Sequence, residues 1–404
     1  MLSLIKKSKF LKLKSRNLAG EFVYLAMLSF FEYAHTDFII QHGEGLNEFV
    51  KAEITEVGAK VNEQGFRVSR FNASPLQLVS LVYTARVSSR ILMPLFKFSA
   101  FHKNKLYGAV RKFPWHSYIS KNESIAVSAS VHNSAIKHSQ YAALTVKDAI
   151  VDEIRSETGG RPDVNVQAPD FHLVLSIQNN NGELSLDLSG PLHLRGYRQQ
   201  SSKAPMRETL AGAIILSIEE KELPIVDLMT GSGTLILEAL MNKAKIPSGY
   251  LRRDFPLFKI PEFDELFQQQ KKKMNGEIIS PPAGFLTAND HSAPMIETAK
   301  YNASALPESA FIHWEQKDFR KLPGFENQVL LCNPPYGIRQ GDKKNLQGLY
   351  RDLGDFLKKK CTGAAAYIYF GEREFIAAIG LHPKWKKTMR SGALDGRLVK
   401  FELY

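Results

Sequence analysis

The chain has 404 residues, and its 53 basic and 41 acidic side chains give a formal net charge of +12. Its 44% hydrophobic residues are enough for buried cores in about two to four domains, which argues against a disordered chain. The two cysteines, Cys332 and Cys361, support neither a disulfide framework nor a four-cysteine zinc site, and the histidines show no metal-ligand spacing. These features predict a reducing, cytoplasmic location and no metal.

Residues 1–35 form a basic and then apolar extension. Six of the first sixteen residues are basic and none is acidic, and an apolar run follows at 22–31. The pattern imitates a secretory signal, but Glu21 and Glu32 bracket the run and no small-residue cleavage site follows. We expect either a genuine basic arm or a translation start at Met27. No apolar run reaches the length of a membrane-spanning helix, so we expect no membrane partner.

Residues 36–118 alternate strand and helix patterns. A strand is expected at 37–40, a helix at 46–57, a strand at 66–68 and a helix that begins at Pro75. This order predicts a small α+β domain with a ferredoxin-like arrangement.

A second α+β domain is expected at 119–190, followed by a linker at 191–205. Its expected elements are a strand at 124–131, a helix from Ser139, and a hairpin of strands 171–177 and 183–188. The hairpin turn is signalled by three asparagines and a glycine at 179–182.

Residues 206–404 repeat a strand, a loop and a helix several times. The expected strands lie at 225–229, 284–289, 310–314, 328–332, 364–370 and 398–403. Strands that alternate with helices predict the α/β class with a mostly parallel, doubly wound, Rossmann-like sheet. In such sheets the ligand binds outside the carboxyl ends of the strands.

The first of these strands ends in a glycine-rich turn. Asp227 is followed by Gly231 and Gly233, and Thr234 opens an apolar helix. Glycines let the backbone approach a ligand, and a helix N-terminus offers free N–H groups to a carboxylate or phosphate. The third glycine of the dinucleotide fingerprint is absent, which argues against a pyrophosphate. An ordinary tight turn remains the alternative.

Two acidic residues follow the next strands. Asp290 ends the second strand, where a carboxylate can accept both hydroxyls of a ribose. The segment 242–284 separates it from the glycines, which implies an insertion of unassigned role. Asp318 follows the third strand and can accept an adenine amine, or it can cap the turn into Phe319.

The most informative motif ends the fourth strand, at Asn333, Pro334, Pro335 and Tyr336. Two prolines stop the strand and leave the carbonyls of Asn333 and Pro334 without ladder partners. Asn333 adds a side-chain carbonyl and Tyr336 a stacking ring. Acceptors beside an aromatic face suit an exocyclic amine on a flat base. A plain strand terminator explains the prolines but not their Asn and Tyr neighbours.

Together the two motifs resemble the amino-methylating branch of the class I S-adenosylmethionine-dependent methyltransferases. Upstream segments at 138–142, 146–150, 160–162, 169–170 and 186–190 look like a THUMP domain, an RNA-binding module. The connector at 193–198 with 204–211 is similar to the one in THUMP-containing ribosomal RNA guanine-N2 methyltransferases. The resemblance covers about residues 36 to 404. Leu228 and Thr230 depart from it, since the family often has Pro and Cys there.

This resemblance implies S-adenosylmethionine as cofactor and RNA as partner, most specifically 23S rRNA or a large-subunit precursor, and no DNA. The implied cofactor-binding residues are Thr209, Asp227, Gly231, Gly233, Thr234, Asp290 and Asp318. The implied catalytic residues are Asn333 and Pro334, which accept the guanine amine, and Tyr336, on which the base stacks. Candidates for RNA phosphate contacts are Lys137, Arg195 and Arg198.

Four alternatives stay open: a tRNA guanine-N2 methyltransferase of the same architecture, a DNA amino-methyltransferase, a protein glutamine methyltransferase and a non-catalytic RNA-binding assembly factor. A DNA enzyme should carry a target-recognition domain, and none is recognisable here. A protein glutamine methyltransferase needs no THUMP-like module, and the intact motifs argue against a non-catalytic protein. The sequence does not identify the target nucleotide or the oligomeric state. The interpretation requires the glycine turn and the Asn333 motif to face each other across one cleft.

Overall fold

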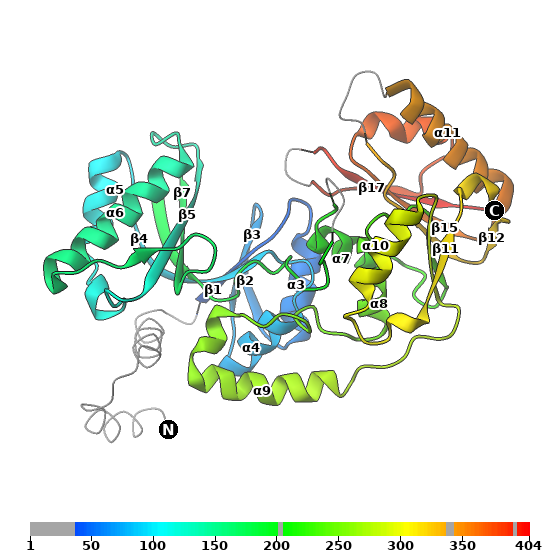
Figure 1. Ribbon diagram of the computed structural model, residues 1–404. Coiled ribbons are helices and arrows are strands. Elements are labelled where there is room, and N and C mark those ends of the chain that lie inside the picture. The colour runs from blue at the N-terminus through cyan, green and yellow to red at the C-terminus, as the bar shows by residue number, and fades with distance from the viewer. Residues whose placement is uncertain (1–36, 201–204, 337–342, 391–393) are drawn as a thin grey trace. The chain divides into compact units, whose positions relative to one another are not determined.

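The computed structural model describes residues 37–200, 205–336, 343–390 and 394–404 (Figure 1). The expected extension at 1–35 lies outside the described residues. The described chain forms two compact units, one of 92–187 with 256–264, and one of 37–91, 188–255 and 265–404. The division at 91/92 differs from the expected boundary at 118/119. Within the described ranges, no helix combines the length and apolar character needed to cross a bilayer.

The first unit is a mixed sheet covered by two helices. Strand β4 enters it from the second unit, and its strands follow the order β4-β8-β7-β5-β6. Helices α5 and α6 lie side by side, and α6 packs on β5 (Figure 1). The bounds are β4 (Arg90–Ser99), α5 (Lys103–Arg111), β5 (Ser124–His132), α6 (Ser139–Thr158), β6 (Asp163–Val164), β7 (Phe171–Gln178) and β8 (Asn181–Asp187).

The hairpin, strand β5 and helix α6 of this unit confirm the sequence predictions. Asn179 and Asn180 have φ of 51° and 61°, the left-handed values that a tight hairpin turn needs. Strand β4 was not expected, and Pro94 in mid-strand removes one donor from its ladder. The structure accommodates Pro94 at a shift in register between Pro94 and Phe96, opposite β8.

The N-terminal part of the second unit is a three-stranded antiparallel sheet, β2-β3-β1, with two helices. Helix α4 begins as expected at Pro75, and Ser74 and Gln77 form a capping box. The strand expected at 66–68 is wrong, since Arg67 has a φ of 60° in the turn between β2 and β3. The bounds are β1 (Asp37–Gln41), α3 (Asn47–Glu56), β2 (Lys60–Gly65), β3 (Val68–Asn72) and α4 (Pro75–Thr84).

The rest of the second unit is built on a seven-stranded sheet in the order β11-β10-β9-β13-β15-β17-β16. All pairs from β11 to β15 are parallel, and β17 and β16 add antiparallel strands at one edge. The strand bounds are β9 (Ile225–Asp227), β10 (Leu286–Asp290), β11 (Ile312–Gln316), β13 (Val329–Cys332), β15 (Ala365–Phe370), β16 (Trp385–Thr388) and β17 (Arg397–Glu402). The predicted doubly wound sheet is confirmed, although β16 was not expected.

The helices cover both faces of this sheet, as expected for alternating strands and helices (Figure 1). One core lies between the sheet and α11, where Tyr350, Leu353 and Leu357 pack among residues of β13, β15 and β17. The strand order reverses at β9: β10 lies on one side of it, and β13, which comes later in the chain, lies on the other. A ligand crevice is expected at that point. The helices are α7 (Glu208–Leu216), α8 (Thr234–Lys243), α9 (Pro261–Asn275), α10 (Ala293–Ala303) and α11 (Lys343–Lys360).

Candidate active site

A cavity of about 540 Å³ opens at the carboxyl ends of β9, β10 and β13. Gly231 and Thr234 of the glycine turn line it, and so do Asn333 and Pro335 of the proline motif. The required cleft between the two motifs is therefore present. The remaining lining residues are Pro205, Met206, Leu228, Met229, Thr230, Ser232, Leu235, Asp290, His291, Ser292, Met295, Asp318, Phe319, Arg320 and Leu349.

The glycine turn is held by backbone and side-chain contacts from β10. The Thr230 N–H donates to the Asn289 carbonyl at 2.9 Å, and the Gly231 N–H donates to Asp290 Oδ2 at 2.9 Å. Gly231 has a φ of 52°, and a Cβ there would meet no atom within 4 Å, so this glycine faces open space at the cavity. Gly233 has a φ of 92° and begins α8, where a Cβ would lie 3.1 Å from that of Ala299 on α10. Glycine here therefore permits close helix packing as well as the turn.

Asp227 lies behind the turn rather than in the cavity lining. Its side chain is fully buried, and neither carboxylate oxygen has a hydrogen-bond partner among the described residues. Burial raises the pKa of Asp227 to about 7, against the opposing effect of the adjacent Thr230 side chain and Met229 backbone, and the nearby charge of Asp290 acts in the same direction as burial. Asp227 is therefore partly protonated near neutral pH. A cationic group bound nearby would lower its pKa and favour the ionised form.

The proline motif presents an acceptor without a partner. Asn333 Oδ1 is buried and has no hydrogen-bond partner in the described part of the chain. The loop is anchored by the Tyr350 hydroxyl, which donates to the Pro335 carbonyl at 3.4 Å. The Tyr336 ring packs on Gly371, where a Cβ would approach the ring within 2.5 Å. Burial raises the pKa of Tyr336, so its hydroxyl stays neutral.

Both expected acids, Asp290 and Asp318, line the cavity. Asp290 already accepts the N–H groups of Gly231 and Ser292, each at 2.9 Å, so it also fixes the glycine turn. Asp318 caps the turn into Phe319 and pairs with Arg320 at 3.0 Å, which is the capping role left open by the sequence. The hydrogen bond and charge of Arg320 lower the pKa of Asp318 despite some burial that opposes them, so Asp318 stays ionised.

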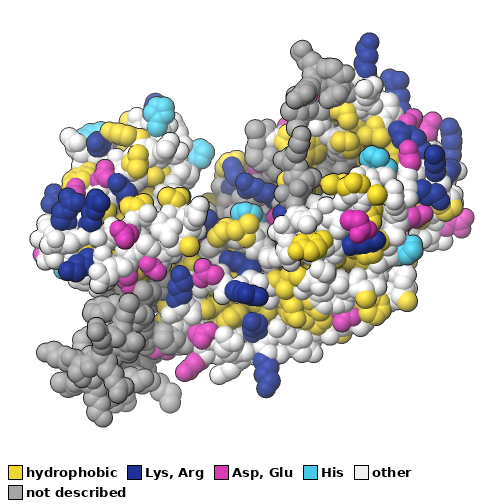
Figure 2. Space-filling view, viewed as in Figure 1, with side chains coloured by type: hydrophobic (Ala, Val, Ile, Leu, Met, Phe, Trp, Pro, Cys, Tyr) yellow, Lys and Arg dark blue, Asp and Glu magenta, His cyan; other side chains and the backbone are white. Residues whose placement is uncertain are grey.

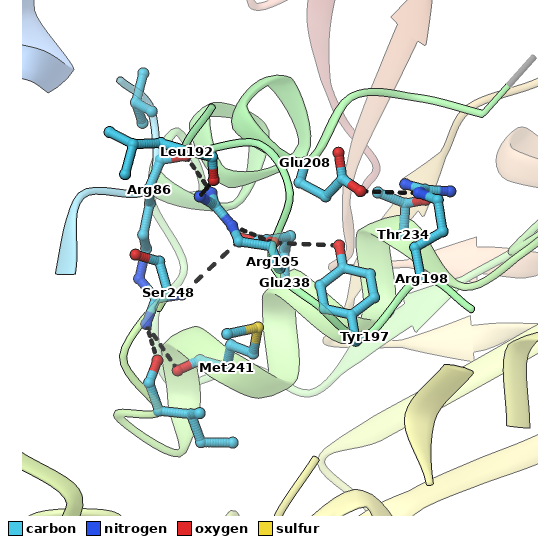
Figure 3. Close-up of polar contacts among 12 residues, drawn as sticks. Arg86, Leu192, Arg195, Tyr197, Arg198, Glu208, Thr234, Glu238, Met241 and Ser248 are labelled. Atoms are coloured by element: carbon cyan, nitrogen blue, oxygen red, sulfur yellow. Dashed lines mark hydrogen bonds and ion pairs between the residues drawn. The ribbon is translucent and has the colours of Figure 1, made fainter. Parts of the chain in front are cut away.

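The connector at 195–198 lies along α8 (Figure 3). Arg195 is only 1% exposed, and its Nε donates to Glu238 Oε1 at 3.1 Å, while the Tyr197 hydroxyl donates to the same oxygen at 3.2 Å. This buried arginine cannot reach an RNA phosphate, so the expected RNA contact at Arg195 is wrong. Its partner Glu238 lies 43 positions further along the chain, and no local signal reveals the pairing.

The expected RNA contact at Arg198 is also corrected by the structure, because its guanidinium donates hydrogen bonds to acceptors of the protein itself (Figure 3). It donates to Glu208 at 2.8 Å, to the Met206 carbonyl at 3.0 Å, and to the hydroxyls of Ser232 and Thr234 at 3.2 and 2.9 Å. Arg198 thus joins the connector, the start of α7 and the glycine turn. The third RNA candidate, Lys137, is exposed in the first unit, as a phosphate contact requires.

The cavity therefore brings together five of the predicted residues: Gly231, Thr234, Asp290, Asp318 and Asn333. The others, Thr209, Asp227, Gly233, Pro334 and Tyr336, do not line it. Sequence reasoning missed Asn289, and it missed the role of Arg198; both hold the turn from behind. No local motif signals either role, because each depends on contacts with residues distant in the sequence.

Comparison with known proteins decides the family. The model of the RMKL-like methyltransferase domain matches residues 195–400, and that of the THUMP domain matches residues 102–187. The chain belongs to the RMKL-like methyltransferase family. Methyltransferases of this family take S-adenosylmethionine as methyl donor. The described cavity thus belongs to an enzyme domain.

Relatives and solved structures agree with this family. A Synechocystis protein named "Putative RNA methyltransferase" is 33% identical over 368 residues, which cover 89% of this chain and 95% of the relative. The ribosomal RNA large subunit methyltransferase K/L of Syntrophotalea carbinolica is 31% identical over 376 residues, 89% of this chain but 52% of that protein. This chain therefore spans about half the length of the K/L relative.

A crystal structure titled as a predicted N6-adenine-specific DNA methylase from Listeria monocytogenes superposes with a TM-score of 0.77. The match covers 91% of this chain and 96% of that chain at 22% identity. At this identity the likeness supports the fold of the family and nothing about the substrate.

The residues present fit the cofactor of the family. The cavity volume lies in the range of small-molecule sites, roughly 300–1,000 Å³. The hydroxyls of Ser232 and Thr234 line the cavity beside the N-terminus of α8, and the carboxylates of Asp290 and Asp318 line it as well. The cavity thus offers donors for a carboxylate and acceptors for a nucleoside, as an amino acid joined to a nucleoside requires.

Proposed function

We propose that the chain methylates the exocyclic N2 amine of a guanine in RNA, with 23S rRNA or a large-subunit precursor as substrate. The observation that carries this proposal is the buried Oδ1 of Asn333, which has no hydrogen-bond partner among the described residues and lies on the same cavity as the glycine turn. The THUMP match and the names of the relatives support RNA as the substrate class.

The glycine turn, α8 and the two acids hold the cofactor in this proposal. Thr234 and the free N–H groups of α8 face its carboxylate end, with Thr209 nearby on α7, and Arg198 fixes the hydroxyls of that region. Asp290 accepts the ribose and Asp318 the adenine amine. Asp227 and Gly233 shape the turn from behind. Bound there, S-adenosylmethionine supplies a methyl group already activated on a sulfonium.

The proline motif orients the target amine. The Asn333 side chain and the Pro334 carbonyl accept its two N–H groups, so that the nitrogen lone pair is turned out of the ring plane toward the methyl donor. The base stacks on Tyr336. Positioning of this kind can contribute about 7–11 kcal/mol to the reaction, so no strong general base is required. The proton that the nitrogen loses after transfer leaves to water.

Such a pocket demands an accessible base. A guanine in a duplex must leave its stack, at a cost of a few kcal/mol, before its amine can reach Asn333. Looped or assembling RNA is therefore favoured over a closed duplex.

The test is transfer of labelled methyl groups to unmodified 23S rRNA, tRNA and duplex DNA, followed by mass mapping of the labelled nucleoside. We expect N2-methylguanine in 23S rRNA with the wild-type chain and its loss in Asn333→Ala, with cofactor binding retained. Asn62→Ala, which changes an exposed asparagine on β2, serves as the matched control and keeps full activity.

Four results would contradict the proposal. Label on tRNA alone would move the substrate to tRNA, and label on adenine of DNA would remove RNA altogether. Wild-type turnover in Asn333→Ala would remove the role of the amide. A chain that binds RNA but no S-adenosylmethionine would instead be an assembly factor.

A further inference from the structure

Three arginines of the second unit converge on one carboxylate. Arg373 lies 3.6 Å, Arg390 3.4 Å and Arg397 2.7 Å from Asp395. Arg373 and Arg397 also line a groove of about 370 Å³ together with Lys386, and its apolar wall includes Ile376 and Leu381. We call Arg373, Arg390, Arg397 and Lys386 the arginine cluster.

The three arginines of the cluster share one carboxylate. Arg390 has a second partner in Glu44 at 3.3 Å, and Lys386 adds a further positive charge to the adjoining groove. A carboxylate cannot satisfy the fifteen or so N–H donors of three guanidinium groups, since each carries about five. The Arg373 side chain is 74% exposed, so several of its donors point to solvent. Exposed ion pairs add little stability, and the crowding of like charges therefore needs another explanation.

The cluster lies beside the loop that is proposed to grip the base. The Tyr336 ring packs on Gly371, and Arg373 follows two residues later in the chain. Met389, just after β16, and Gly396, just before β17, lie at the same place. The Tyr369 hydroxyl donates to the Met389 carbonyl at 3.1 Å, and a Cβ on Gly396 would collide with that hydroxyl.

We propose that the arginine cluster binds RNA phosphates next to the guanine that enters the active site. This inference rests on the proposed function and assigns part of its RNA surface. A base that has swung out of its stack keeps its covalent backbone, so the flanking phosphates must lie near the mouth of the pocket. Arginine forks match phosphate oxygens in bidentate geometry, and the apolar wall of the groove suits a ribose or base face.

Positive charge alone does not mark this surface. In Figure 2, basic side chains also gather over α11, where acidic side chains are interspersed. Lys359 on α11 is as exposed as Arg373, at 71%, and also pairs with an aspartate, Asp355 at 3.1 Å. It lies at the end of α11 that precedes β14 (Cys361–Thr362), at the opposite end of the strands from the cavity. Lys359 thus provides a matched control.

The experiment compares the wild-type chain, Arg373→Gln/Lys386→Gln and Lys359→Gln in filter binding to unmodified 23S rRNA transcript at several salt concentrations. We expect the double variant to weaken binding at least about tenfold at 150 mM salt and to flatten the slope of log K against log salt by about 1.4, since each phosphate contact to a single strand contributes about 0.7. Lys359→Gln should match the wild type. Cofactor affinity and melting temperature should be unchanged in both variants.

Wild-type RNA affinity and salt slope in the double variant would overturn the assignment and leave an acidic protein surface as the partner of the cluster. A loss of RNA binding that comes with a loss of cofactor binding or of melting temperature would overturn it as well, because the cluster would then be structural. Failure of the wild-type chain to bind the transcript would instead remove the proposed function itself.

Discussion

Two groups of arginines in the second unit differ in burial and in partners. Arg195 and Arg198 of the connector are 1% and 17% exposed, and their donors are used by acceptors of the protein. Arg373 is 74% exposed and shares Asp395 with two other arginines. Arg195 joins the connector to α8 and Arg198 joins it to the glycine turn, whereas the second group is the one proposed to bind RNA phosphates. Partners, rather than residue type, decide which role an arginine takes.

The physical reason is the cost of removing charge from water. A buried guanidinium must recover its hydration from the protein, which Arg195 does through Glu238 and the carbonyls of Ala85, Arg86 and Leu192. An exposed guanidinium keeps its hydration and can exchange it for phosphate oxygens. The comparison therefore makes opposite predictions for stability and for binding.

Arg195→Ala should give the largest loss of stability. The change leaves Glu238 buried without its main partner, and removal of one partner of a buried pair costs about 3–5 kcal/mol. We expect this loss in the free energy of unfolding measured with urea. A double variant, Arg195→Met/Glu238→Met, should recover only part of it, because the charge of Glu238 is removed but Arg86, 3.9 Å from Glu238, then loses that carboxylate. A single variant as stable as the wild type would show that the buried pair is not a determinant of the fold.

Asp227 extends the comparison to a buried acid with no ion-pair partner among the described residues. Its pKa of about 7 lies above the value near 3.8 of an unfolded chain, so the folded state holds an extra proton between these pH values. Stability from this group is therefore greatest below about pH 4 and falls as pH rises to about 7. Asp227→Asn should stabilise the cofactor-free chain at pH 8 by at most about 4 kcal/mol and leave it unchanged at pH 4. Urea unfolding at both pH values tests the sign, and destabilisation at pH 8 would contradict it.

Arg198→Lys should affect the cofactor rather than the fold. A lysine ammonium is a single point of charge and cannot reach Glu208, Met206, Ser232 and Thr234 together. We expect the Kd for S-adenosylmethionine to rise about tenfold, which is about 1.4 kcal/mol, with a larger change in KM than in kcat. Arg207→Lys, an exposed arginine at the start of α7, is the control. Unchanged cofactor affinity in Arg198→Lys would leave Arg198 with a purely structural role.

Much of the fold could be predicted because its signals are local. Alternating residues and the asparagine turn specify the β7–β8 hairpin, and the strand and helix periodicity specifies the parallel sheet. The residues that were missed depend on distant partners. Strand β4 tolerates Pro94 only because a register shift opposite β8 accommodates it, and β16 exists only as an edge strand on β17.

The site divides in the same way. Gly231, Asp290 and Asn333 belong to motifs at strand ends, and parallel strands bring such ends to one edge, so their meeting could be predicted. The burial of Arg195 could not, because it depends on Glu238 in a helix that follows only after the glycine turn. For Asp318 the sequence offered two alternatives, a cavity position and a cap on the turn into Phe319. The structure shows both together, and the sequence could not have indicated this.

Arg373→Ala should have the smallest effect on stability, which completes the contrast with Arg195. The side chain is mostly in water, and exposed substitutions of this kind leave stability nearly unchanged. We expect a melting temperature within about 2 °C of the wild type. The same variant should still lose RNA affinity. Arg373 would then affect binding without affecting stability, whereas the substitution of Arg195 affects stability. A marked drop in melting temperature would show that the arginine cluster stabilises the fold near β16 and β17. Both groups of arginines would then have a structural role.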